Sequence, residues 1–102
     1  MTRIISANLN GIRSASNKGF FNWLATQNAD IVCVQELKAQ ADVVETAFAQ
    51  TTDHQGYFHS AEKKGYTGAG IYTRHTPDEV VAGFGWGAFE HDGCYVEARF
   101  GT

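Results

Sequence analysis

The chain has 102 residues, of which 43% are hydrophobic and 19% are charged, and its formal net charge is −3. This length limits the chain to one domain at most. No apolar run reaches the roughly 18 residues that a membrane-spanning helix needs, and the opening "MTRIISANLN" lacks the long apolar stretch of a signal peptide. We therefore expect no membrane partner and a cytoplasmic location.

The acidic balance argues against a nucleic-acid partner, but the charge is unevenly distributed. Up to Arg74 the chain has seven basic and six acidic residues, and after Arg74 it has one basic and five acidic residues. The first three quarters are thus nearly neutral. A local phosphate-binding face is compatible with this distribution, although the overall charge does not predict one.

The first half of the chain predicts a strand, a helix and a second strand. Phe20, Trp23 and Leu24 have the spacing of one helix face, with Ser16 or Asn17 as an N-cap. The apolar run Ile31–Val34 is typical of a strand buried on both faces, as in a parallel sheet. In chain order we expect a strand over 3–7, a polar loop over 8–18, a helix over 20–27 and a strand over 31–34.

The second half predicts one more helix followed by short strands. Asp42 and Glu45 have the Asp-x-x-Glu spacing of a capping box at the start of a helix. The sequence His91-Asp92-Gly93 is typical of a hairpin turn. We expect the strands over 57–61, 71–74, 80–84 and 95–100.

These elements predict an α/β fold with a mixed sheet and two helices, which we interpret as a single partial domain over residues 1–102. Two helices cover one face of a sheet, so the other face is expected to be bare, and a bare apolar face favours self-association. Cys33 and Cys94 lack metal-ligand spacing and are expected to be free thiols. The four histidines are interpreted as surface residues.

Polar side chains follow the first two predicted strands at the point where each strand ends. Asn8 and Asn10 follow the first strand, and Glu36 and Lys38 follow the second. Ligand sites of α/β sheets gather at the carboxyl ends of parallel strands. If the two strands are neighbours, these side chains converge on a set of carboxylate and amide oxygens that suits Mg²⁺ or Mn²⁺ rather than zinc. Lys38 would point to the same side as Glu36 if the strand continued, and could orient the carboxylate or meet a phosphate.

A purely structural interpretation of these residues is also open. Asn10-Gly11 is a common turn pair, because Asn tolerates a left-handed backbone. A glutamate after an apolar strand is often just the solvated end of that strand. Spacing alone does not separate the two interpretations.

Four ordered elements of the chain resemble the exonuclease III family of abasic-site endonucleases, within the endonuclease–exonuclease–phosphatase superfamily. They are "SANLNGIR", "CVQELK", "GYTGAGIYTR" and "EHDGCYVEARF". The resemblance implies the first half of a four-layer α/β sandwich. It also implies metal-dependent hydrolysis of the phosphodiester 5′ of an abasic site, together with 3′→5′ exonuclease activity on duplex DNA in base-excision repair.

The resemblance also assigns roles to residues of this sequence. Asn8 and Glu36 match metal-site positions, with Mg²⁺ or Mn²⁺ as the ion. Asn10 and Lys38 match the catalytic network beside that metal. Three further residues match positions that contact the DNA backbone: Arg13, Lys18 and Tyr66. For Tyr66, an aromatic residue packed in a loop is the alternative.

Several elements of the family pattern are not found in this sequence. No Gly-Asp-x-Asn occurs, and His91-Asp92 reverses the family's final Asp-His pair. The resemblance therefore covers somewhat less than half of the catalytic domain, and we expect these 102 residues to be inactive alone. Two alternatives stay open: a sister phosphodiesterase acting on lipid or inositol phosphates, and a non-catalytic interaction half-domain.

Overall fold

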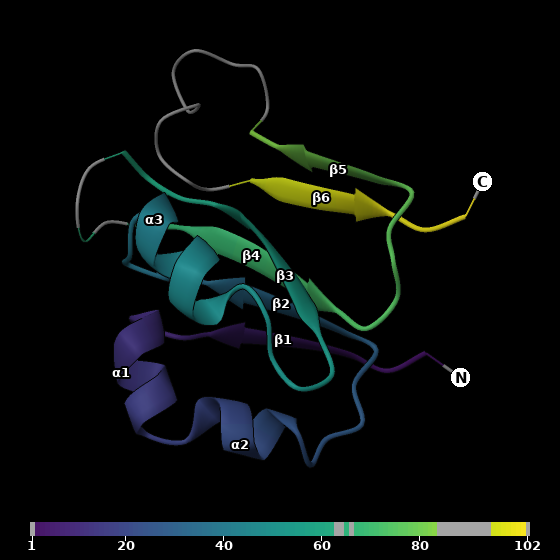
Figure 1. The fold of residues 1–102 in the computed structure, drawn as a ribbon, viewed down its shortest axis with the longest axis horizontal. Coiled ribbons are helices and arrows are strands. Elements are labelled where there is room, and N and C mark those ends of the chain that lie inside the picture. Colours follow the sequence, from purple (N-terminus) through teal and green to yellow (C-terminus); the bar gives the residue numbers. More distant parts are fainter. Residues whose placement is uncertain (1, 63–64, 66, 84–94, 102) are drawn as a thin grey trace.

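The computed structural model describes residues 2–62, 65, 67–83 and 95–101. In these ranges the strands form two sheets (Figure 1). The four-stranded sheet has the order β1-β2-β4-β3, and β5 pairs with β6 in a two-stranded sheet. The strands are β1 (Ile4–Asn8), β2 (Ile31–Gln35), β3 (Gln55–His59), β4 (Ala69–Thr73), β5 (Glu79–Ala82) and β6 (Val96–Arg99).

The larger sheet is mixed, as the sequence predicts. β1 and β2 are parallel, with Asn8 opposite Gln35 at their carboxyl ends. β4 is antiparallel to both β2 and β3. The predicted strands lie within two residues of the observed ones at their first residue, while the predicted hairpin turn at 91–93 and Cys94 lie outside the described residues. Cys33 is a free thiol, and burial raises its pKa.

The helices are shorter and more numerous than predicted. They are α1 (Ile12–Asn17), α2 (Phe20–Leu24) and α3 (Ala41–Val43), the last continuing into the π-helical turn η1 (Val44–Phe48). The polar loop expected over 8–18 was therefore wrong, because half of it is helix α1. This helix lacks an apolar stripe, and it is anchored instead by Ile12, which is fully buried.

The predicted helix caps were also wrong. α2 begins after Gly19, which has a φ of 95°, and neither Ser16 nor Asn17 caps it. α3 begins after Gln40, and no side chain caps that end. Both helices are held by tertiary packing of their apolar residues, which is the usual source of stability for helices this short.

The core lies between the helices and one face of the larger sheet. Val32 and Val34 of β2 and Tyr72 of β4 are almost fully buried on this face. Tyr72 packs edge-on against Phe21 of α2 and Phe58 of β3, with ring centroids 5.6 and 5.5 Å apart. No membrane-spanning helix is found in the described ranges, since none of their helices is long and apolar enough.

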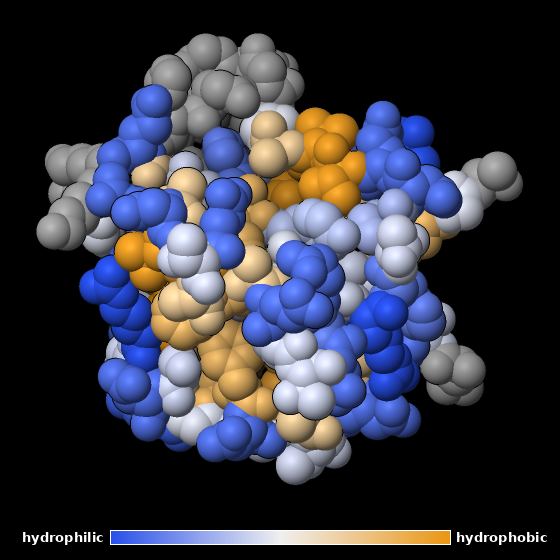
Figure 2. Space-filling model, viewed as in Figure 1, coloured by the Kyte–Doolittle hydropathy of each residue, from blue (hydrophilic) through white to orange (hydrophobic). Residues whose placement is uncertain are grey.

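The opposite face of the sheet is only partly exposed. Exposure is greatest on β1, where Ile4 is 62% exposed. Ile31 and Cys33 of β2 are half-buried on this face, so the prediction that β2 is fully buried on both faces was wrong. β6 contacts β3 and β4, and β5 contacts β3. Figure 2 shows apolar side chains gathered over β5, where Val80 and Val81 are partly exposed.

Candidate metal centre

The candidate metal centre lies where β1 and β2 end side by side. The backbone of the segment after β1 is bonded to the segment after β2 at three successive points. Leu9 N donates to Gln35 O at 3.0 Å, Gly11 N to Glu36 O at 2.8 Å, and Ile12 N to Leu37 O at 2.8 Å. These bonds bring the two segments into contact, and they also satisfy amide groups at the start of α1.

Three residues of the centre have a left-handed backbone. The φ angles are 48° for Asn10, 52° for Glu36 and 53° for Lys38. Asn adopts this conformation readily, but for Glu and Lys it is uncommon and costs energy. β2 ends at Gln35, so the strand does not continue to Lys38, and the shared direction of Lys38 and Glu36 that such a continuation would give does not apply. Strained residues of this kind cluster at functional sites in proteins.

The side chains of the centre form one chain of hydrogen bonds. Asn8 Nδ2 donates to Glu36 Oε2. The backbone amide of Asn10 donates to Asn8 Oδ1 at 3.0 Å, and Lys38 Nζ donates to Asn10 Oδ1 at 2.6 Å. The structure thus brings together all four residues that the sequence placed at these strand ends.

The donor set fits a hard cation. Among the described residues, Glu36 accepts a side-chain hydrogen bond only from Asn8, so its carboxylate retains lone pairs for a ligand. Mg²⁺ needs one or two carboxylates and keeps several waters. In this arrangement the nitrogen of the Asn8 amide faces Glu36, so Asn8 orients the carboxylate. No cluster of three or more His, Cys, Asp or Glu side chains occurs in the part of the chain that the structure describes.

The predicted DNA-contact residues are only partly placed. Arg13 lies on α1 and Lys18 is the residue that ends it, and both are exposed. Lys18 lines a shallow hollow of about 310 Å³ together with Asn8, Phe20 and Trp23, so it lies near the candidate centre. Tyr66 lies outside the described residues. Its neighbours Thr67 and Gly68 bond to Lys38 and Leu37, so these two residues lie directly against the centre.

Sequence reasoning missed a second polar cluster around Asp30, at the amino end of β2. The buried Asp30 carboxylate accepts hydrogen bonds from Arg3 N at 2.8 Å, Arg74 Nη2 at 3.0 Å and His75 Nε2 at 2.8 Å. These bonds, that of Arg3 first, hold the pKa of Asp30 well below its usual range. His75 thus has an acidic partner that sequence spacing did not reveal.

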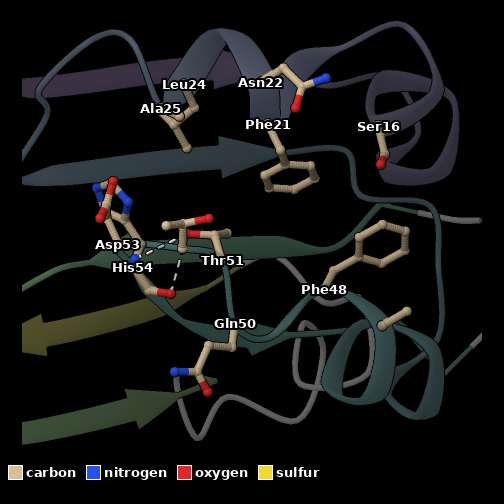
Figure 3. A pocket seen from close by; sticks show the side chains of 12 residues that line it. Ser16, Phe21, Asn22, Leu24, Ala25, Phe48, Gln50, Thr51, Asp53 and His54 are labelled. Carbon is tan, nitrogen blue, oxygen red and sulfur yellow. Dashed lines mark hydrogen bonds between the residues drawn. The ribbon is translucent and has the colours of Figure 1, made fainter.

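A cavity of about 240 Å³ lies between α2 and the segment that precedes β3 (Figure 3). Phe21 and Phe48 line it with stacked rings, 6.0 Å apart. His54 also lines it and is 6% exposed, with Nε2 2.8 Å from Ala29 O. The interpretation of His54 as a surface residue was wrong. The cavity shares no lining residue with the candidate metal centre.

Residues 5–101 match the family described as Endonuclease/Exonuclease/phosphatase family. The chain belongs to this family. The match spans both strand-end segments of the candidate centre and the turn that supports them.

The family relatives and solved structures that the chain resembles are named as DNA-processing enzymes. An exodeoxyribonuclease of Bacillus subtilis is 33% identical over 96% of this chain and 38% of its own length. A DNA-(apurinic or apyrimidinic site) endonuclease of Dictyostelium discoideum is 29% identical over 96% of this chain and 27% of its own length. This chain therefore spans well under half the length of both relatives.

The fold agrees with that of a solved family structure. An AP endonuclease from Archaeoglobus fulgidus superposes with a TM-score of 0.80 and 26% identity, over 96% of this chain and 37% of the other. This likeness confirms the predicted α/β fold with a mixed sheet, and it is consistent with part of a larger sandwich.

Proposed function

We propose that this chain carries the metal-binding part of a DNA-repair nuclease that hydrolyses phosphodiesters 5′ of abasic sites and trims 3′ ends of duplex DNA. One observation carries the proposal: Asn8, Asn10, Glu36 and Lys38 form a continuous hydrogen-bonded set on left-handed turns at adjoining strand ends. The names of the relatives support DNA as the substrate.

Each residue of the set has a role that its contacts suggest. Glu36 would hold Mg²⁺ or Mn²⁺, and the bound ion would neutralise charge on the scissile phosphate. Asn8 fixes the carboxylate through its amide nitrogen. Lys38 fixes Asn10 and places a positive charge beside the centre. Arg13 and Lys18, both exposed, would attract DNA phosphates without regard to sequence.

Titration with Mn²⁺ tests the proposed ion site directly. Paramagnetic Mn²⁺ should broaden the NMR amide signals of residues near Asn8 and Glu36, and Glu36→Gln should abolish this response. Glu45→Gln is a matched control, because Glu45 is exposed on η1. Broadening that survives Glu36→Gln would contradict the proposal.

DNA binding is tested by its dependence on salt. Arg13→Ala and Lys18→Ala should each weaken binding to an abasic duplex, and each should lower the slope of log K against log salt by about one. An unchanged slope in both variants would contradict the proposed contacts. A preference for inositol phosphate over abasic duplex in competition would favour the sister phosphodiesterase instead.

We further propose that these 102 residues do not cleave DNA by themselves. In the described residues no histidine or second carboxylate joins the hydrogen-bonded set around Glu36, so the set offers no general base for water. Incision of an abasic duplex by the purified chain, abolished by EDTA, would overturn this proposal.

Self-association through the exposed side of β1 is a related proposal. Ile4 is 62% exposed on the sheet face away from the helices. Ile4→Lys should shift the chain toward monomer in sedimentation velocity, since a charge in an apolar contact is costly. A monomeric wild-type chain would contradict it.

A further inference from the structure

The segment after β2 contains a β-bulge centred on Glu36. Gln35 is the register partner of Ala69, yet the next bond runs from Leu37 N to Gly68 O at 3.2 Å, followed by Lys38 N to Thr67 O at 2.7 Å. Two residues, Glu36 and Leu37, therefore oppose the single residue Gly68. Bulges next to functional sites redirect side chains, and this one places a left-handed residue at Glu36.

Gly68 allows the two segments to approach closely. Its φ is +99°, and a Cβ added there would lie 3.1 Å from Leu37 Cβ and 3.6 Å from Leu37 N. Both contacts are with the Cβ and the backbone nitrogen of Leu37. A change of side-chain rotamer moves neither atom, so it would not relieve the contacts. The contact with Leu37 Cβ is the tight one, so an L-residue at this position would push Leu37 aside by a few tenths of an ångström, whereas 3.6 Å to Leu37 N is an ordinary van der Waals distance.

Leu37 transmits any such displacement to the candidate metal centre. Its side chain is fully buried, and the two residues that flank it are Glu36 and Lys38. Glu36 contacts Asn8, and Lys38 contacts Asn10. A shift of Leu37 would therefore move the two residues that carry these polar side chains, because tightly packed interiors transmit strain.

We propose that Gly68 is a positioning residue, which clamps the bulge through Leu37 and so holds Glu36 and Lys38 in the geometry of the metal centre. The role of Glu36 as an ion ligand rests on the proposed function. The close contact between Gly68 and Leu37 is a property of the backbone and does not depend on that function. It gives Gly68 a task of its own, namely to set the conformation of the ion ligand.

The test compares Gly68→Ala with Gly19→Ala. Gly19 has a nearly equal φ of +95°, and no described neighbour lies within 4 Å of an added Cβ, so it matches the backbone strain without the contact. Gly68→Ala should raise the Mn²⁺ dissociation constant by about tenfold or more, the usual effect of losing support around a metal ligand. Gly19→Ala should leave that constant within about twofold.

Amide hydrogen exchange of Leu37 and Lys38 provides a readout that does not depend on the metal. Exchange of both amides should be at least about tenfold faster in Gly68→Ala than in the wild type, with no such change in Gly19→Ala. If Gly68→Ala fails to fold, Gly68→Asn replaces it, because Asn tolerates a left-handed backbone while its Cβ still contacts Leu37.

The outcomes separate the two proposals. Unchanged Mn²⁺ affinity in folded Gly68→Ala would overturn the positioning role. If the wild-type chain does not respond to Mn²⁺, the proposed function fails. Unchanged amide exchange rates of Leu37 and Lys38 in Gly68→Ala would show that Gly68 does not hold this segment in place, whether or not the ion binds.

Discussion

The two ends of β2 each carry a carboxylate, and their surroundings differ. Asp30, at the amino end, is buried and accepts hydrogen bonds from the Arg3 backbone and from the Arg74 and His75 side chains. Glu36, just past the carboxyl end, is half-buried and has Asn8 as its side-chain partner among the described residues. The Asp30 carboxylate accepts four hydrogen bonds from the protein and has little capacity left for a ligand, whereas a carboxylate held by a single amide keeps most of its capacity.

This difference teaches that polar clusters in one small sheet can serve opposite purposes. The Asp30 cluster joins the start of β1, the start of β2 and the end of β4, so we interpret it as structural. The Glu36 cluster joins hydrogen-bonded polar side chains on strained turns, which is the arrangement expected of a binding site. Four predictions test this division.

The largest expected effect comes from neutralising each carboxylate in turn. Glu36→Gln should eliminate Mn²⁺ binding while leaving the fold intact, and Asp30→Asn should lower the unfolding midpoint while leaving Mn²⁺ binding in the folded protein unchanged. NMR line broadening and thermal unfolding by circular dichroism measure the two properties. Loss of Mn²⁺ binding in folded Asp30→Asn would contradict the view that Asp30 is structural and Glu36 alone binds the ion.

Removal of the amide that holds Glu36 should have the next largest effect. Asn8→Ala should weaken Mn²⁺ binding by about tenfold, because the carboxylate loses its orienting donor. Gln35→Ala is the control, since this neighbouring amide bonds to Ser6 Oγ at 3.1 Å and not to Glu36. Equal losses in the two variants would show that Asn8 has no specific role.

The Asp30 end should show a dependence on pH. The pKa of Asp30 is lowered in the folded chain, so on acidification the unfolded chain takes up this proton first. The stability that Asp30 contributes is therefore present above the ordinary aspartate pKa of about 3.9 and is lost as the pH falls toward the folded value. Urea unfolding should depend less steeply on pH in Asp30→Asn than in the wild type between about pH 5 and 3. Equal slopes would contradict this prediction.

The smallest expected effect is that of His75. Its side chain is 58% exposed although Nε2 lies 2.8 Å from Asp30. His75→Ala should cost less than about 1 kcal/mol of unfolding free energy, because exposed ion pairs contribute little and Arg3 and Arg74 still bond to Asp30. Urea unfolding at neutral pH measures this cost. A loss as large as that of Asp30→Asn would mean that the histidine holds the cluster together.

Strands were easier to predict than helices in this chain. The apolar runs around Ile5, Val32 and Val34 set the strands by local pattern alone. Helix α1 escaped prediction, because its only fully buried residue is Ile12 and its first amides bond to a distant segment. The capping residues also failed, since tertiary contacts replaced the side-chain caps.

The sequence by itself determined which residues stand at the two strand ends, because an apolar run followed by Asn-x-Asn or Glu-x-Lys is a local pattern. Tertiary structure alone decided how those residues meet. Parallel pairing of β1 with β2 brought Asn8 to Glu36, and Glu36 and Lys38 have a left-handed backbone where their segment bonds to Gly68 and Thr67. Tertiary structure likewise joined Asp30 to Arg74 and His75, more than 40 residues away. No local pattern encodes such contacts, since they exist only once the sheet has formed.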